Sequence, residues 1–289
     1  MRVVLLGSTG YIGQHLLSIY PDARTPRVDI ADPSAVAAML DDERPDVLIN
    51  AAGKTGRPNV DWCEQHKEET LRVNVMGTLV LREACAARGI YWVHMSSGCI
   101  YAGDAGGAGF TEDDPPNFAG SYYSRTKAWS EQMLKDLSSP EGGRGGILIV
   151  RPRMPFDGTM HDRNLIRKLV RYSRVLDEPN SLTYVPDMLQ AIRILVERGA
   201  TGIYNMVNPG TLSPYAIMER YRDIVDPGHA FERLPVSRLG TTVTTGRSNC
   251  ILSCDKLLRE GIALLHVEEA LESALQHMRA HAGVAEVRL

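Results

Sequence analysis

The sequence is poor in cysteine and aromatic residues and has no long apolar run. Its longest apolar runs, such as residues 147–150, fall far short of the ~20 residues that a membrane-spanning helix needs. Neither charge dominates, because 32 Lys and Arg stand against 35 Asp and Glu, a formal net charge of −3. With no basic run either, the composition argues against a nucleic-acid partner, and we expect no membrane association.

The few cysteines are not spaced as in a disulfide framework. They are odd in number, which favours reduced thiols, and Met1 leads into a predicted strand with no visible signal peptide. We therefore expect a cytoplasmic protein. No cysteine stands at zinc-finger spacing from histidines, so no metal site is expected. The cysteines are Cys63, Cys85, Cys99, Cys250 and Cys254.

Short apolar runs and amphipathic stretches alternate over the first 150 residues. Such runs suit buried parallel strands, and apolar residues three or four apart suit helices. This order predicts an α/β fold with a doubly wound parallel sheet. The runs lie at 2–6, 46–50, 91–95 and 146–150, with a poorly marked strand near 22–24. The helical stretches lie at 12–20, 33–40, 69–88 and 121–135.

Beyond residue 150 the alternation loses its regularity. The chain of 289 residues exceeds the ~250 at which single domains mostly stop growing. We therefore place a first domain at 1–150 and a smaller C-terminal lobe mainly at 151–289. The segment near 185–206 and the C-terminal helix are expected to return to the first domain. Helices are expected at 164–174, 187–198, 213–224 and 268–281.

A glycine-rich turn joins the first predicted strand to the first helix. Strand, turn and helix in this order bring backbone N–H groups and a helix N-terminus to one point, which favours a pyrophosphate. Glycine is needed where the chain turns sharply and where backbone touches phosphate. The spacing G-x-x-G-x-x-G therefore predicts a dinucleotide site formed by Gly7, Ser8, Thr9, Gly10, Tyr11, Ile12 and Gly13.

The residues around the poorly marked second strand bear on which dinucleotide binds. An acidic residue at the end of that strand would hold a ribose 2′-hydroxyl, whereas an arginine suits a 2′-phosphate. Arg24 and Arg27 favour NADPH, while Asp29 keeps NADH open.

Small and polar residues follow the predicted strand 46–50. Ala51, Ala52 and Gly53 would let backbone approach a cofactor, because ligands of open α/β sheets bind just past the carboxyl ends of strands. An ordinary connection to the next helix fits this spacing equally well. The polar residues that follow and are candidates for substrate binding are Thr55, Arg57 and Asn59.

Tyr123 and Lys127 stand four residues apart in a predicted helix, so they share one face. A free tyrosine titrates near ~10, and a cation held close favours the phenolate. Tyr123 could then act as a general acid beside a carbonyl. A surface helix that happens to carry both residues is the alternative. Ser97, just past the predicted strand 91–95, could bind the same carbonyl. Cys99 lies within reach of that pocket, although for Cys99 taken alone a packed small hydrophobic side chain is the favoured role.

Together these motifs resemble the extended short-chain dehydrogenase/reductase family, in its dTDP-4-dehydrorhamnose reductase-like branch. Within the branch the chain looks most like the nucleotide-sugar 3,5-epimerase/4-reductases that make NDP-rhamnose. The resemblance covers nearly the whole chain. It is carried by NAAGKTGRPNVDWCE at 50–64, RVNVMGT at 72–78, GCI at 98–100, PNF at 116–118, RMP at 153–155 and NPG at 208–210.

The resemblance implies a Rossmann domain that binds NADPH, with NADH open, and a lobe that binds a nucleotide sugar. By this resemblance Ser97, or alternatively Ser96, forms the reductase triad together with Tyr123 and Lys127. Asn74 would support the lysine and contribute to the cofactor site. Cys99 and Lys168 match an epimerase acid/base pair, and simple 4-reductases of this branch lack the cysteine. Further substrate-binding candidates are Ser97, Gly98, Arg153, Asn164, Asn180 and Arg247.

The activity implied is 3,5-epimerisation and 4-keto reduction of UDP- or dTDP-4-keto-6-deoxyglucose to a rhamnose-type nucleotide sugar. One alternative is a 4-reductase or epimerase of a different 4-keto nucleotide sugar, including GDP sugars, because GDP-fucose synthase has a similar Ser-Ser-Cys-Ile-Tyr run. Another is a non-catalytic regulatory homologue. A homodimer, the commonest assembly, is kept as the candidate oligomeric state.

Overall fold

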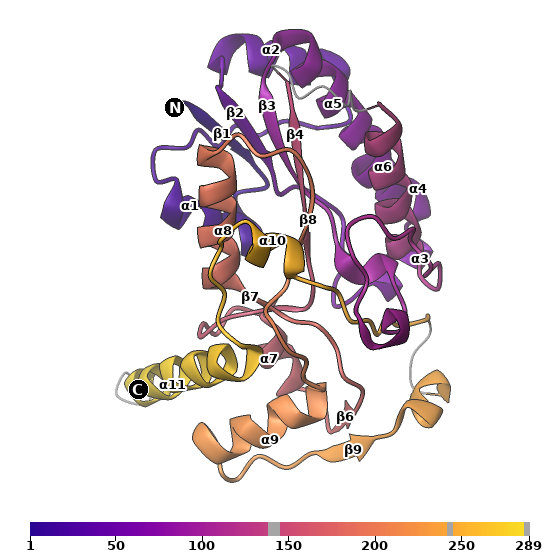
Figure 1. Cartoon of the computed structure of the whole chain (residues 1–289), viewed down its shortest axis with the longest axis vertical. Coiled ribbons are helices and arrows are strands. Elements are labelled where there is room, and N and C mark those ends of the chain that lie inside the picture. The colour runs from indigo at the N-terminus through magenta and orange to yellow at the C-terminus, as the bar shows by residue number, and fades with distance from the viewer. Residues whose placement is uncertain (138–144, 242–244, 286–289) are drawn as a thin grey trace.

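The computed structural model describes residues 1–137, 145–241 and 245–285, and its centre is a five-stranded sheet. The strands follow the order β1-β2-β3-β4-β8 (Figure 1), and each neighbouring pair is parallel. This arrangement confirms the predicted α/β fold class. The strands are β1 (Val3–Leu6), β2 (Val47–Asn50), β3 (Tyr91–Met95), β4 (Ile147–Pro152) and β8 (Gly202–Met206).

Helices cover both faces of the sheet (Figure 1). Val3 and Leu5 of β1 pack towards α1 and α8, whereas Val4 and Leu6 pack towards α2, α5 and α6. Successive strand residues point to opposite faces, so strands buried on both faces read as continuous apolar runs. The helices are α1 (Tyr11–Ile19), α8 (Val185–Glu197), α2 (Pro33–Glu43), α5 (Gly77–Arg88) and α6 (Tyr122–Leu137).

The second strand expected near 22–24 is reduced to a single bridge between Val4 and Arg24. Arg24 donates its backbone N–H to the Val3 carbonyl over 2.9 Å and accepts one from Leu5 over 2.8 Å. Pro21 and Pro26 flank this bridge, and proline has no N–H with which to extend a ladder. The chain thus runs on both sides of β1, which creates the switch point at which ligands of such sheets bind.

The helix expected at 69–88 contains a π-helical turn. The turn η1 (Arg72–Met76) joins α4 (Lys67–Leu71) to α5 without a break and packs against α6. π-Helical turns inside α-helices frequently occur at functional sites. This one carries the buried Asn74.

A second apolar core lies below the sheet in Figure 1, around α7 (Leu165–Leu169), α9 (Pro214–Ile224) and α11 (Val267–Ala285). The C-terminal helix α11 was expected to return to the first domain, but it packs on α9 instead. Its apolar face, including Leu271 and Leu275, is buried in this core. By contrast, segment 185–206 forms α8 and β8 and lies on the sheet.

Helix α7 is shorter than the predicted helix 164–174. After Leu169 the chain turns, and β6 (Arg174–Leu176) pairs in parallel with β9 (Glu232–Leu234). A distant strand therefore overrides the local helical spacing. The remaining elements are α3 (Asp61–Gln65), η2 (Gly98–Ile100), η3 (Ala105–Gly107), β5 (Pro155–Phe156), β7 (Thr183–Tyr184), η4 (Val236–Thr241) and α10 (Asp255–Arg259).

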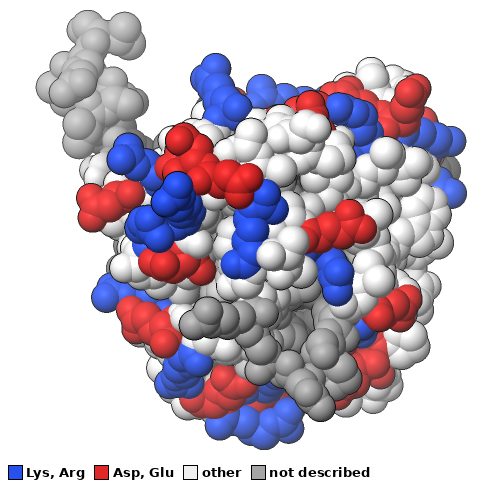
Figure 2. All heavy atoms as spheres, turned by 90° about the horizontal axis from the view of Figure 1, so that it is seen from above, with Lys and Arg blue, Asp and Glu red and all other residues white. Residues whose placement is uncertain are grey.

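The surface shows no separation of charges on the face seen in Figure 2, where Lys and Arg are interspersed with Asp and Glu. Within the described ranges, no helix combines the length and the apolar character that crossing a membrane requires.

Candidate active site

The glycine-rich turn is closely packed against the turn that follows β2. Gly7 has a φ of +77°, and a Cβ atom there would lie 2.5 Å from the backbone nitrogen of Ala52. A Cβ atom on Gly13 would lie 2.1 Å from the Gly7 carbonyl oxygen. A side chain at Gly7 would therefore force the two turns apart, and one at Gly13 would push α1 away from the glycine-rich turn. Because Thr9 and Gly10 stay exposed where α1 begins, this cradle fits the pyrophosphate of a dinucleotide.

Within this turn Tyr11 is placed differently from its neighbours. Ile12 and Ser8 are half-buried, whereas the Tyr11 ring is buried against two histidines. Its centroid lies 4.9 Å from the ring of His15 and 4.9 Å from that of His161. Burial and the nearby Asp157 carboxylate raise the pKa of Tyr11. The phenol thus joins the turn to the second lobe.

Arg24 and Asp29, the residues expected to choose between NADPH and NADH, are both exposed at the edge beyond β1. The Asp29 carboxylate is paired with Arg72 of the π-helical turn, and this contact lowers the pKa of Asp29. The acidic residue is therefore already held by an arginine, whereas the Arg24 side chain is exposed to solvent.

The turn after β2 is clamped by Asn74. The Asn74 amide nitrogen donates to the Lys54 carbonyl over 3.0 Å, and the amide oxygen accepts from the Lys54 N–H over 2.8 Å. The same nitrogen donates to the Thr126 hydroxyl over 3.1 Å. A Cβ atom on Gly53 would lie 3.5 Å from the Asn74 amide oxygen and 3.7 Å from the Lys127 ammonium. The structure therefore brings Ala51, Ala52, Gly53, Asn74 and Lys127 together.

Tyr123, Ser97 and Lys127 meet at the carboxyl end of β3. The Ser97 hydroxyl lies close enough to Tyr123 to act on its pKa, and the Lys127 ammonium donates to the Met95 carbonyl over 3.0 Å. Burial lowers the pKa of Lys127 to about 8. The lysine was expected to lower the pKa of Tyr123, but burial dominates and raises it, with Cys99 adding to the rise and Ser97 opposing it.

Ser96, the alternative to Ser97, has a different partner. Its hydroxyl donates to the Glu131 carboxylate over 2.8 Å, and Arg151 donates to the same oxygen over 2.9 Å. This buried ion pair was missed by the sequence analysis. The signals available were the spacing of Lys127 and Glu131, four residues apart on α6, and the arginine two residues before Arg153.

Cys99 faces a buried arginine. The Arg153 guanidinium donates to the Cys99 sulfur over 2.9 Å and to the Asn180 side-chain oxygen over 2.6 Å. Gly98 packs closely beside this arginine, since a Cβ atom there would lie 2.6 Å from a methyl group of Leu252 and 3.4 Å from the Arg153 Cβ atom. Cys99, Gly98, Arg153 and Asn180 therefore form one cluster beside Tyr123.

Lys168 lies on α7 near this cluster. Burial lowers the pKa of Lys168, the charge of Arg163 lowers it further, and Cys99 opposes the shift. Arg163, which the sequence analysis missed although it precedes Asn164, donates to the Thr55 hydroxyl over 3.0 Å. The amine and the thiol are thus close enough to affect each other electrostatically.

Three candidate substrate residues are bound by the chain itself. Asn164 is fully buried, and its amide donates to the Asp157 carboxylate over 2.7 Å while its oxygen caps α7 at Ile166. Arg247 forms two bonds with Asp61, of 2.7 and 2.9 Å. Asn59 accepts the Asp61 N–H over 2.8 Å. Arg57, by contrast, is exposed.

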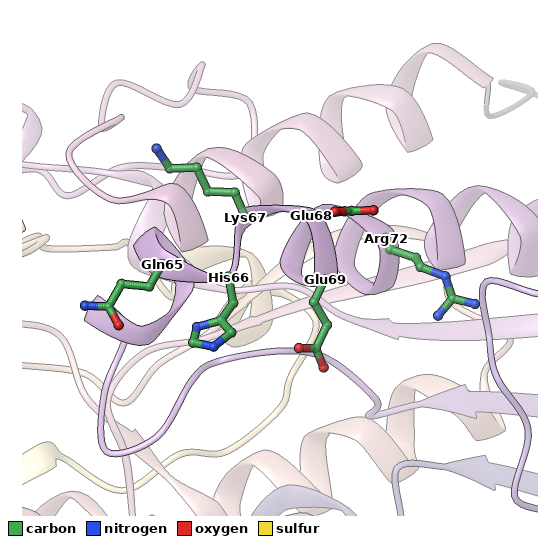
Figure 3. Close-up of a pocket in the computed structure, with 6 residues that line it drawn as sticks. All are labelled: Gln65, His66, Lys67, Glu68, Glu69 and Arg72. Atoms are coloured by element: carbon green, nitrogen blue, oxygen red, sulfur yellow. The ribbon is translucent and has the colours of Figure 1, made fainter.

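An open hollow near α3 and α4 lies apart from these groups. Figure 3 shows the residues that line it, and no candidate catalytic residue is among them. Across the part of the chain that the structure describes, no cluster of His, Cys, Asp or Glu could hold a metal ion. The residues around the hollow are Gln65, His66, Lys67, Glu68, Glu69 and Arg72.

A glycine cradle at the switch point of a parallel sheet, with Ser, Tyr and Lys at the end of the third strand, defines a protein of the short-chain dehydrogenase/reductase class. The chain belongs to the family described as RmlD substrate binding domain, whose model matches residues 1–280.

Individual relatives agree with this assignment. The chain is 37% identical over 283 residues to a bifunctional dTDP-4-dehydrorhamnose 3,5-epimerase/dTDP-4-dehydrorhamnose reductase of Arabidopsis thaliana, with 93% of this chain and 90% of the relative covered. It is 35% identical to the trifunctional rhamnose enzyme RHM2 of the same plant, covering 94% of this chain and 41% of that protein.

Solved structures share the fold. The L780 UDP-rhamnose synthase of Acanthamoeba polyphaga mimivirus matches with a TM-score of 0.89 and 27% identity, covering 96% of this chain and 99% of that one. The dTDP-4-dehydrorhamnose reductase of Bacillus anthracis, solved in complex with NADP, matches with a TM-score of 0.80 and 23% identity, covering 94% of this chain and 97% of that one.

Proposed function

We propose that the protein is an NADPH-dependent enzyme that epimerises C3 and C5 and reduces the C4 ketone of a UDP- or dTDP-4-keto-6-deoxyglucose. Family membership and the relatives' names support a nucleotide-sugar reductase. The observation that carries the epimerase part is Cys99, held beside Tyr123 and close to Lys168. The cytoplasmic location and the homodimer stay predictions.

Epimerisation needs two proton-transfer groups. C3 and C5 both flank the ketone, so each C–H bond is acidified. Removing a proton from one side of the sugar ring and returning one from the other inverts the centre. Cys99 can accept the proton as a thiolate and Lys168 can donate one as an ammonium. Because burial lowers the pKa of Lys168, that ammonium releases its proton more readily than an exposed lysine would.

Reduction uses the groups at the end of β3. NADPH, when bound at the glycine-rich turn, would supply the hydride for C4. Tyr123 protonates the developing C4 oxygen, and Ser97 binds the same oxygen. Asn74 holds the backbone at Lys54 and so keeps Gly53 beside Lys127. The exposed glycine-rich turn and Arg24 would hold the diphosphate and the ribose of NADPH.

The test is to incubate the protein with NADPH and either UDP- or dTDP-4-keto-6-deoxyglucose in D2O and to analyse the product by NMR. We expect an L-rhamnose configuration with deuterium at C3 and C5. Cys99→Ala should abolish deuterium uptake, whereas Tyr123→Phe should stop reduction and retain the uptake. NADPH consumption without deuterium would leave a plain 4-reductase, and no reaction with either nucleotide would refute the proposed substrates.

A further inference from the structure

Arg153 is a buried cation without an acidic partner. Arg153 is only 4% exposed. Among the described residues, no carboxylate forms an ion pair with its guanidinium. The guanidinium donates instead to the Asn180 amide oxygen over 2.6 Å, to the Ser248 carbonyl and to the Cys99 sulfur over 2.9 Å. An uncompensated buried charge costs several kcal/mol, so this environment favours a negative charge next to it.

The guanidinium is held rigidly and still has an unused donor. The Arg153 backbone N–H donates to the Thr183 hydroxyl over 2.7 Å, which fixes the start of the side chain. Its Nε–H is buried and has no hydrogen-bond partner within the described part of the chain. The side chain therefore points into the cluster with spare capacity for an anion.

Two sulfurs lie near the guanidinium, and their surroundings differ. Cys250 is 1% exposed, its thiol donates to the Gly98 carbonyl over 3.3 Å, and burial raises its pKa. A thiol that donates to a carbonyl keeps its proton. Cys99 is half-buried and receives a hydrogen bond from the cation, so Cys99 is the sulfur placed to carry the negative charge.

We infer that Arg153 acts through Cys99 in the epimerisation step: its guanidinium orients the sulfur and stabilises the thiolate that removes the proton from C3 or C5. This inference rests on the function proposed above and adds a residue to it. Burial acts to lower the pKa of Arg153, but Cys99, as the largest opposing influence, and the other groups around the guanidinium outweigh it and the pKa is raised. The guanidinium therefore remains charged throughout.

The proton balance of the step is complete. The thiolate takes the proton from the carbon, and the electron pair of that C–H bond moves into the enolate, whose charge lies on the C4 oxygen. The Lys168 ammonium then protonates the carbon on the other side, which restores the ketone. The thiol and the amine regain their starting states by exchange with water. No oxidant or reductant is consumed.

One test measures Cys99 alone, without substrate. Iodoacetamide alkylation is followed at pH 7 and pH 10, and the Cys99 peptide is identified by mass spectrometry. The ratio of the two rates removes differences in access. An ordinary thiol is only a few per cent thiolate at pH 7, so its alkylation rate at pH 7 is a small fraction of its rate at pH 10. For Cys99 in the wild-type protein we expect a ratio of the two rates about tenfold larger than for an ordinary thiol. A ratio at the ordinary level would overturn the inference, and this result needs no variant.

Variants then assign the effect to the guanidinium. Arg153→Gln should lower the alkylation ratio about tenfold, whereas Arg153→Lys, which keeps the charge, should stay within about threefold of wild type. Cys250→Ser is the matched control, because it changes the other sulfur near Arg153 and should leave the ratio unaltered. Equal ratios in Arg153→Gln and wild type would contradict the inference.

The final readout is deuterium uptake at C3 and C5 as a function of pH. The titratable or charged groups that face Cys99 are Tyr123 from α6, Lys168 from α7, Cys250 and Arg153. In Arg153→Gln the uptake should fall about a hundredfold at neutral pH and recover towards higher pH. A raised KM with unchanged kcat would leave Arg153 as a substrate-binding residue only. Wild-type protein without any uptake would refute the proposed function, while the alkylation result would still stand.

Discussion

Lys127 is only 4% exposed, and its ammonium donates a hydrogen bond to the Met95 carbonyl over 3.0 Å. Its pKa is about 8 in the folded chain, against an ordinary value of 10.5. The unfolded chain therefore binds this proton more tightly. Below pH 8 the buried charge reduces the stability of the fold, and the reduction disappears as the pH rises from 8 to 10.5. It amounts to about 3 kcal/mol in order of magnitude.

We predict that Lys127→Met removes this pH-dependent reduction. Relative to wild type, the variant should be most favoured at pH 7, and its advantage should decline by about 3 kcal/mol towards pH 10.5. The measurement is urea unfolding of both proteins at pH 7, 8.5 and 10. A stability difference that is constant across this range would show that the folded-state pKa of Lys127 is ordinary.

At the scale of elements, the π-helical turn η1 links two parts of the cofactor site. It presents Asn74 to the Lys54 backbone and to Thr126 of α6 at the same time. A regular α-helix across 72–76 would rotate Asn74 relative to the residues that follow it. The turn thus places the Asn74 amide between the segment that follows β2 and the helix α6, which carries Tyr123 and Lys127.

Asn74→Ala should weaken NADPH binding about tenfold, because the Lys54 N–H and carbonyl both lose their partner and the turn at Gly53 loosens. The binding constant can be measured from the change in NADPH fluorescence. Val75→Ala, one residue further along the same turn, is the control and should bind NADPH as wild type does. Equal affinities in Asn74→Ala and wild type would mean that the clamp is irrelevant to the cofactor.

At the scale of the whole molecule, Asp157 connects the dinucleotide half to the lobe that carries Lys168. One carboxylate oxygen lies 2.6 Å from the His15 ring nitrogen on α1, and the other accepts from Asn164, the cap of α7. Burial opposes the effect, but the contacts with His15 and Thr159 lower the pKa of Asp157. The contribution of Asp157 to the free energy of unfolding is therefore present above its unfolded-state pKa of about 4. It is lost as the pH falls through the lower folded-state pKa.

We predict that Asp157→Ala lowers the free energy of unfolding by about 2 to 4 kcal/mol at pH 7, since a buried and paired charge is removed. It should also reduce deuterium uptake more than ketone reduction, because α7 carries Lys168. Asp162→Ala is the matched control: this exposed carboxylate on the same loop pairs with Arg171 at the surface, so the free energy of unfolding should stay close to that of wild type. A loss of stability in Asp157→Ala that persists unchanged below pH 3 would contradict the electrostatic origin.

The fold class, the glycine cradle and the Tyr123–Lys127 pair were predictable from the sequence because each depends on local spacing. Apolar runs indicate buried strands, glycine marks the turn where a Cβ atom would collide, and a four-residue interval places two side chains on one helix face. The α/β class is confirmed, whereas the strand near 22–24, the length of α7 and the position of α11 were wrong. In each of these three, proline or a distant packing partner overrode the local pattern.

Only the tertiary structure decided which side chains meet across long intervals of sequence. Cys99 and Arg153, His15 and Asp157, and Asp61 and Arg247 each make contact although no periodicity relates them. It also decided that Asn164 serves its own helix and that burial, rather than the nearby lysine, controls the pKa of Tyr123. Burial and distant pairing are properties of the folded chain, so residue types and spacing specify the chemistry available while packing determines which groups carry it out.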